Sequence, residues 1–264
     1  MPRQDPPRST KRGAVAPTVV ERLRAAGCVF AEDEARLIAT APGSAAERED
    51  LVRRRVAGEP LEHLLGWVEF RSRRVAIEPG VFVPRRRTEF LVEQAVRVAG
   101  DAHLVVELCC GCAAVASALA AELGGAEVHA CDVDPVAVGC ARRNVPHVHE
   151  GDLFDALPPG LRGRIDVVVA NAPYVPSAEI VLMPPEAREH EPRIALDGGS
   201  DGLDVQRRIV SDAPRWLAPG GHLLIETSER QAGALAAEFA ANGFATETAY
   251  GADTGATVAL GRLR

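Results

Sequence analysis

The sequence contains no apolar run that approaches the ~18 residues needed to span a membrane. Residues 1–13 are basic, but they lack the apolar stretch of a secretory signal. We therefore expect a cytoplasmic protein, in which residues 1–13 form a disordered tail. The net charge of −7 argues against a general nucleic-acid binder, so we do not expect direct nucleic-acid binding.

The sequence also lacks the second C-x-x-C pair of a typical structural zinc site. Cys109 and Cys112 have ligand spacing, and Cys131 ends a nearby apolar run. A structural zinc site takes four ligands, however, and no second pair or nearby His pair is present. We expect no metal, and we interpret these cysteines as small buried side chains at strand ends. The six cysteines do not indicate a disulfide framework in a chain of this kind.

The positive charge is concentrated in one short strip. Residues 71–87 contain six arginines and a single acid, Glu78, whereas the rest of the chain beyond the N-terminal tail is acidic. Such a strip could dock an acidic protein or RNA. It could equally protect the edge of a solvated hairpin, and the sequence leaves both interpretations open.

Periodicity divides the chain into regions. Residues 14–60 predict three short helices, one of them opening with Ser44 and Glu47 at capping-box spacing. Residues 61–84 are rich in β-branched and aromatic residues around Pro79-Gly80, which is typical of a hairpin linker. Residues 85–264 form the remaining, larger domain.

From residue 103 the pattern alternates between strands and helices. The continuous apolar runs are typical of parallel strands that are covered on both faces. They cover residues 103–109, 126–131, 165–171 and 221–227, with helical stretches at 113–123, 135–144 and 204–217. Residues 245–250 and 256–263 predict an antiparallel edge pair. The expected fold class is therefore a doubly wound α/β sheet.

Polar residues follow the first strands of this sheet. Glu107 ends the first strand, Gly111 lies in the next turn, and Asp132 follows 21 residues later, a spacing that suits a carboxylate accepting from ribose hydroxyls. Asp152 and Leu153, after the third strand, would border an adenine. The predicted cofactor-binding residues are Glu107, Cys109, Cys110, Gly111, Cys112, Ala113, Asp132, Asp152, Leu153 and Asn171.

The turn lacks the G-x-G-x-x-G of nicotinamide-binding proteins. It resembles class I S-adenosylmethionine (SAM)-dependent methyltransferases, which have an acidic residue, then G-x-G-x-G, then a second acid. Cys109, Gly111 and Ala113 occupy the three glycine places. The resemblance implies SAM as cofactor. A sheet that keeps the pattern without binding SAM remains an alternative.

A buried strand leads into Asn171-Ala172-Pro173-Tyr174. The Asn171 side-chain oxygen and the Ala172 carbonyl could accept both hydrogens of a planar –NH2 group. Pro173 biases Ala172 towards an extended backbone, and Tyr174 could form a wall. We predict that these four residues are the catalytic group, at the same sheet edge as the cofactor.

Residues 14–264 resemble the HemK/PrmC family of protein-(glutamine-N5) methyltransferases. The family motif Asn-Pro-Pro-Tyr corresponds to residues 171–174, and further matching stretches are 58–70, 83–95, 191–203 and 219–226. The resemblance implies a helical substrate-binding domain, a hairpin linker and a SAM domain with a mostly parallel seven-stranded sheet. It also implies a glutamine acceptor in a protein, usually a release factor or a ribosomal protein.

Two positions depart from the family pattern. Ala172 replaces the first Pro of the motif, and Arg86 replaces a Pro in the Arg-Pro-x-Thr-Glu segment. Ala172 keeps the backbone carbonyl but lifts the restriction on Asn171, so we expect looser positioning of Asn171. The chain could be a side branch that keeps the chemistry and has another protein target.

Other functions remain open. Enzymes that methylate exocyclic amines of nucleic acids end this strand in a similar motif, and the arginine strip favours them while the acidic body does not. A non-catalytic adaptor with a SAM fold is the second alternative. A small-molecule methyltransferase is disfavoured, because such a substrate needs no helical docking domain.

Overall fold

The computed structural model describes residues 17–264. The chain divides into two compact units, the first ending at Gly58 and the second covering Glu59–Arg264. The predicted tail, residues 1–13, lies outside the described residues, as do residues 14–16. Within residues 17–264, no helix is both long enough and apolar enough to cross a membrane.

The first unit contains the three predicted helices, α1 (Val19–Ala25), α2 (Ala31–Thr40) and α3 (Ala45–Val56). The predicted capping box opens α3, because Ser44 and Glu47 each accept the backbone N–H of the other. These caps matter because helices of this length are marginal in isolation. The role of this unit in binding a substrate stays a prediction.

The second unit begins with α4 (Leu61–Leu65) and a hairpin of β1 (Trp67–Phe70) and β2 (Arg73–Ala76). Its two turn residues, Arg71 and Ser72, both have positive φ angles, 50° and 57°. The hairpin turn is therefore at 71–72 and not at Pro79-Gly80, which follow β2. The predicted hairpin is present, but its turn uses residues other than Gly or Asn, the usual ones for this conformation.

The arginine strip is not a free basic surface. Four of its arginines contact other residues of the second unit: Arg71 pairs with Glu93 and Glu122, Arg85 with Glu191, Arg87 with Glu226, and Arg74 lies over the Trp67 ring. Arg73, Arg74, Arg86 and Arg87 are nevertheless exposed, and Arg74 and Arg87 keep their contacts at the surface. The strip therefore combines ion pairs within the second unit with exposed positive charge.

The second unit is built on a seven-stranded sheet with the order β5-β4-β3-β6-β7-β9-β8. Its strands are β3 (Leu104–Leu108), β4 (Glu127–Asp132), β5 (His147–Glu150), β6 (Ile165–Ala170), β7 (Leu217–Thr227), β8 (Phe244–Gly251) and β9 (Ala256–Leu263). The pairs among β3–β7 are parallel, and β9 pairs antiparallel with both β7 and β8. The predicted α/β class, the parallel strands and the antiparallel edge pair are confirmed.

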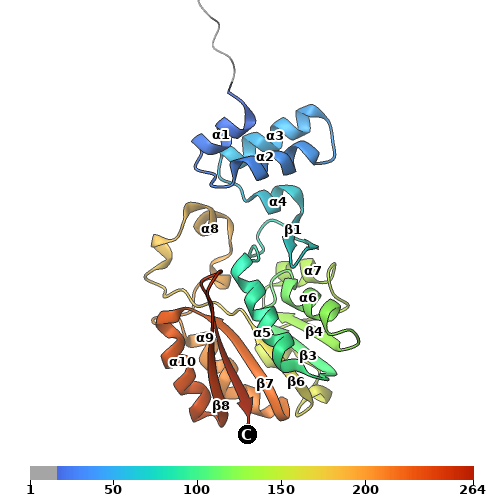
Figure 1. Cartoon of the computed structure of the whole chain (residues 1–264), viewed down its shortest axis with the longest axis vertical. Helices are drawn as coiled ribbons and strands as arrows, with labels where there is room; N and C mark the ends of the chain where they lie inside the picture. The colour runs from blue at the N-terminus through green and yellow to red at the C-terminus, as the bar shows by residue number, and fades with distance from the viewer. Residues whose placement is uncertain (1–16) are drawn as a thin grey trace, which may run out of the picture. The chain divides into compact units, whose positions relative to one another are not determined.

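Helices cover both faces of this sheet (Figure 1). One face carries α5 (Glu89–Ala99), α6 (Ala114–Glu122) and α7 (Pro135–Ala141), and the other carries α9 (Asp204–Asp212) and α10 (Glu229–Ala241). Alternate strand residues enter opposite cores, so Val105 packs with the first group and Val106 with the second. A short helix, α8 (Pro185–His190), lies in the long connection after β6.

Candidate active site

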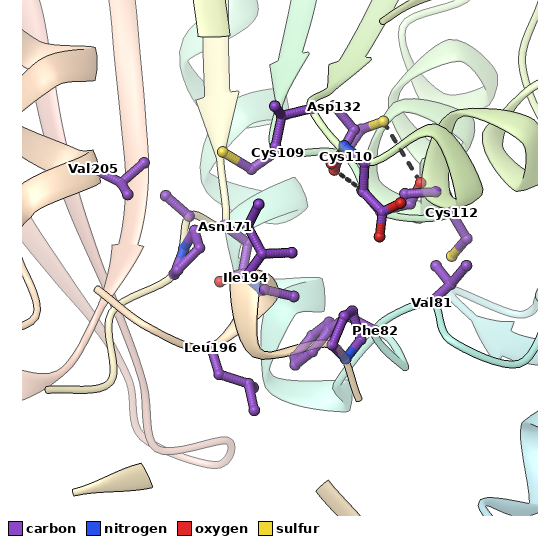
Figure 2. A pocket seen from close by; sticks show the side chains of 18 of the residues that line it. Val81, Phe82, Cys109, Cys110, Cys112, Asp132, Asn171, Ile194, Leu196 and Val205 are labelled. Carbon is purple, nitrogen blue, oxygen red and sulfur yellow. Dashed lines mark hydrogen bonds between the residues drawn. The ribbon is translucent and has the colours of Figure 1, made fainter. Parts of the chain in front are cut away.

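The carboxyl ends of β3, β4 and β6 open onto a cavity of about 350 Å³ (Figure 2). Most of the residues predicted from sequence line it: Glu107, Cys109, Cys110, Gly111, Cys112, Asp132, Asp152, Leu153, Asn171, Ala172, Pro173 and Tyr174. Ala113 is the exception, since it is fully buried beneath the turn. The open-sheet rule, which places ligands beyond the carboxyl ends of parallel strands, holds in this fold.

The turn after β3 has a left-handed backbone at the three positions where the family pattern has glycine. Cys109, Gly111 and Ala113 have φ angles of 54°, 54° and 61°, all in the left-handed region. Glycine enters this region without strain, whereas a residue with a Cβ loses about 1–2 kcal/mol there. The backbone shape of a glycine turn is therefore kept although two of its glycines are replaced. Ala113 contributes through its conformation, as the residue that precedes α6.

A half-buried Asp132 and a buried Glu107 bond the backbone of this turn and of the helix that follows it. Asp132 accepts hydrogen bonds from the backbone N–H groups of Gly111 at 2.8 Å and Asp134 at 3.0 Å. Glu107 accepts from the N–H of Ala116 at 2.7 Å. Burial raises the pKa of Asp132 and raises that of Glu107 to about 8. Because a carboxylate has about four acceptor sites, Asp132 retains acceptor capacity for a ribose hydroxyl at the cavity.

Asp152 and Leu153 form another part of the cavity wall. The Asp152 carboxylate accepts a hydrogen bond from Arg208 at 2.7 Å, which ties the end of β5 to α9. Leu153 is 8% exposed and has a positive φ of 50°, with its carbonyl accepting from the Cys131 thiol at 3.4 Å. The predicted adenine border is thus an apolar side chain beside a charged pair.

The cysteines of the turn do not converge. Figure 2 shows the side chains of Cys109, Cys110 and Cys112 pointing in different directions. Burial raises the pKa of each thiol well above its ordinary value, so each stays protonated and weakly nucleophilic. Across residues 17–264, no group of three or more His, Cys, Asp or Glu side chains is placed to hold a metal ion.

Asn171 follows β6 and has a defined partner. Its Nδ2 donates to the Thr88 hydroxyl at 3.3 Å, which leaves the side-chain oxygen available to another donor. Ala172 is 1% exposed, so its small side chain is packed into the core. The Tyr174 carbonyl accepts from Gln231 at 3.0 Å, and its ring lies 5.8 Å from the Arg87 guanidinium carbon. These contacts anchor both ends of the motif.

The sequence pattern did not assign site roles to Thr88, Arg87 or Glu191. Glu191 accepts from the Val83 N–H at 3.2 Å and from Arg85 at 2.7 Å, and so joins two cavity-lining segments, 81–88 and 192–196. The only signal was that they fall within or beside the family-like stretches 83–95 and 191–203. Their roles become visible only when the fold brings the two segments together.

These features define a class I SAM-dependent methyltransferase. The left-handed turn permits close approach of a ligand to the backbone, and the carboxyl groups of Glu107 and Asp132 lie at two neighbouring strand ends, as the SAM interpretation requires. Residues 105–189 match the methyltransferase domain family. The residues at the cavity therefore fit the cofactor that the resemblance implied.

Comparison with known proteins identifies the family. The chain is 41% identical to the release factor glutamine methyltransferase of Geobacter sulfurreducens, over 77% of this chain and 72% of that one. It is 40% identical to the protein of the same name from Streptomyces coelicolor, over 70% and 68%. The chain therefore belongs to the release factor glutamine methyltransferase family, and the predicted HemK/PrmC resemblance is confirmed.

One relative has a different name. The chain is 38% identical, over 73% of its length and 69% of the relative's, to the 4-amino-L-phenylalanine/4-methylamino-L-phenylalanine methyltransferase of Streptomyces pristinaespiralis. Similarity to this family thus extends to a protein named for a small aromatic amine.

Solved structures agree on the fold. A 16S rRNA methyltransferase of T. thermophilus, in complex with AdoMet and guanosine, superposes with a TM-score of 0.55 at 20% identity, over 75% of this chain and 50% of that one. A methyltransferase from Pyrococcus furiosus superposes with a TM-score of 0.52 at 16% identity, over 71% and 88%. At these identities the likeness establishes the architecture alone.

The left-handed turn predicts opposite effects of one substitution at two glycines. Neither Gly111 nor Gly139 has an atom within 4 Å of a built Cβ, but Gly111 has a φ of 54° and Gly139 lies within α7. Gly111→Ala should lower the free energy of unfolding by about 1–2 kcal/mol. The control Gly139→Ala should raise it by roughly 0.5–1 kcal/mol, as in any exposed helix interior. Chemical denaturation measures both, and equal effects would contradict the role of φ.

The buried Glu107 predicts a pH-dependent loss of stability. Its pKa rises from an ordinary 4.5 to about 8 in the folded protein, so the unfolded chain releases this proton first. The contribution of Glu107 is therefore fully present below pH 4.5 and is lost as pH rises towards 8. Glu107→Gln removes this dependence while keeping an acceptor for Ala116.

Thermal unfolding of wild type and Glu107→Gln at several pH values measures this effect. The free energies of unfolding of the two proteins should be similar near pH 4. By pH 9 the variant should be more stable than wild type by more than about 1 kcal/mol, since one unit of pKa corresponds to about 1.4 kcal/mol. A difference that stays constant from pH 4 to 9 would show that Glu107 ionises normally.

Proposed function

We propose that this protein transfers a methyl group from SAM to the side-chain amide nitrogen of a glutamine in a protein substrate, a release factor or a ribosomal protein, in the cytoplasm. The observation that supports the proposal is the orientation of Asn171: its nitrogen donates to Thr88, which leaves its oxygen available to another donor at a strand end beside the turn after β3. Membership of the family supports the choice of acceptor.

The chemical problem is the low reactivity of the acceptor. An amide nitrogen shares its lone pair with the carbonyl, the same resonance that gives a rotation barrier of ~18–20 kcal/mol. The motif Asn171-Ala172-Pro173-Tyr174 offers no side chain that is an obvious general base. Catalysis must therefore come from orientation, which supplies on the order of 7–11 kcal/mol in the best model reactions.

We assign the following roles. The Asn171 side-chain oxygen and the Ala172 carbonyl accept the two hydrogens of the acceptor –NH2, and their dipoles stabilise positive charge that develops on nitrogen. Pro173 and Tyr174 shape the slot. Glu107, Asp132, Leu153 and the 109–113 turn would hold SAM, which supplies an electrophilic methyl on sulfur. Water and bulk solvent take the proton once the nitrogen is methylated.

A second candidate acceptor is the aromatic amine of a free amino acid. The relative from Streptomyces pristinaespiralis is named for such a substrate. An arylamine is also a planar –NH2 and presents the same two hydrogens to Asn171 and Ala172. Assays of the purified enzyme with SAM and either a glutamine-containing release factor or 4-aminophenylalanine separate the two candidates directly.

Asn171→Ala tests the acceptor role. SAM binding should stay measurable by calorimetry, whereas kcat for methyl transfer should fall by about 100-fold or more, the usual loss when one charge-stabilising group is removed. Asn242→Ala is the matched control, because Asn242 caps α10 outside the cavity lining and its side-chain amide donates to the Glu238 carbonyl. Transfer at the wild-type rate by Asn171→Ala would remove this residue from the mechanism.

A further inference from the structure

The proposed chemistry depends on which end of the Asn171 amide faces the acceptor. The oxygen and the nitrogen of an amide have nearly the same size and shape, so only neighbouring hydrogen bonds decide between the two orientations. With the oxygen forward, Asn171 accepts from the acceptor –NH2. With the nitrogen forward, it would place hydrogens against hydrogens. Something in the fold must therefore select one orientation.

Thr88 is the residue that contacts the Asn171 amide. Its hydroxyl oxygen lies 3.3 Å from Asn171 Nδ2, and the residue is 2% exposed at the end of a 3-10 turn, Arg86–Thr88. A hydroxyl can donate or accept, however, so Thr88 alone would satisfy either orientation of the amide. Its preference depends on where its single hydrogen goes.

A buried carboxylate lies behind Thr88. Glu226 ends the apolar run of β7 and is 1% exposed, and β7 pairs with β6 so that Ile225 is opposite Ala170. Residue 226 is therefore the strand neighbour of residue 171. Thr88, Asn171 and Tyr174 line the cavity, whereas the buried Glu226 does not.

The groups around Glu226 are all donors. Arg87 Nε lies 3.3 Å from its Oε1. Burial raises the pKa of Glu226, while Thr88, Arg87 and Tyr174 lower it. Neither carboxylate oxygen makes a hydrogen bond of good geometry with any residue in 17–264. A buried, acceptor-only group with spare capacity draws hydrogens towards it, because leaving it unpaired is costly.

We propose that Thr88 and Glu226 are positioning residues that keep the Asn171 side-chain oxygen pointed at the acceptor nitrogen. The Glu226 carboxylate takes the Thr88 hydrogen, so the Thr88 oxygen can only accept, and the Asn171 –NH2 must donate to it. The chain of hydrogen bonds runs in one direction because it ends on an anion. This inference rests on the proposed function. The hydrogen bonds of Thr88 and Glu226 would compensate for the looser backbone that Ala172 gives Asn171.

A purely structural role makes different predictions. If Thr88 only fills space in a buried site, valine should replace it better than serine, because valine keeps the volume and removes a buried polar atom. If Thr88 positions Asn171, serine should replace it better than valine, because only serine keeps the hydroxyl. The two variants thus rank in opposite orders under the two roles.

The experiment compares Thr88→Val and Thr88→Ser in the full chain. We expect Thr88→Val to lower kcat about tenfold or more, with the SAM dissociation constant within about twofold of wild type, since one lost hydrogen bond of 1.4 kcal/mol is a factor of ten. Thr88→Ser should stay within about threefold of wild type in kcat. A kcat for Thr88→Val that equals or exceeds that of Thr88→Ser would overturn the proposal.

Glu226→Gln supplies a second readout. Wild-type kcat, measured at saturating SAM, should fall as acid protonates Glu226, since a protonated carboxyl can donate to Thr88 and release the direction of the chain. The glutamine side chain of the variant can also donate to Thr88, and it does not titrate. The variant should therefore have a lower kcat than wild type at neutral pH, and its kcat should no longer fall at acidic pH. An unchanged pH profile in Glu226→Gln would contradict the positioning role.

A measurement without substrate separates this inference from the proposed function. The NMR signal of the Asn171 side-chain amide, assigned by its disappearance in Asn171→Ala, should show slowed hydrogen exchange in wild type and Thr88→Ser. Thr88→Val should lose that protection. If the Asn171 amide hydrogens stay protected in Thr88→Val, the positioning role of Thr88 is refuted even if the enzyme methylates glutamine. If they are protected in a wild-type enzyme that methylates no glutamine, the proposed function is refuted instead.

Discussion

Parallel pairing of β3 with β6 is the constraint on which the site depends. Leu108 lies opposite Ala170, so the left-handed turn that follows β3 begins beside Asn171, which follows β6. The next pair, β6 with β7, then brings Glu226 alongside Asn171. Three strand ends that are far apart in the sequence thus supply the cofactor turn, the acceptor group and the buried carboxylate beneath it.

The sequence predicted the parts of the site that obey periodicity. Long apolar runs marked β3, β4, β6 and β7, and the rule that ligands lie past their carboxyl ends placed Glu107, Asp132 and Asn171 together. The seven-stranded sheet and the family followed from the quoted motifs. These features were accessible because parallel strands read as continuous apolar segments and their ends carry the unusual polar residues.

Other features depended on contacts that no local pattern encodes. The positive φ angles of Cys109 and Ala113 belong to a turn that Asp132 bonds through the Gly111 N–H, a contact between residues 21 positions apart. The arginine strip looked like a surface because three of its partners, Glu122, Glu191 and Glu226, lie 51 to 139 residues further along the chain. Glu226 itself appeared only as the last residue of an apolar strand.

The acceptor geometry gives the account its most direct test, a crystal structure with S-adenosylhomocysteine and a glutamine-containing peptide from a release factor. The glutamine nitrogen should lie about 2.9 Å from both Asn171 Oδ1 and the Ala172 carbonyl oxygen, and about 3–3.5 Å from where the methyl carbon would be, in line with sulfur. A glutamine bound with its oxygen towards Asn171, or held away from the sulfur, would contradict the account.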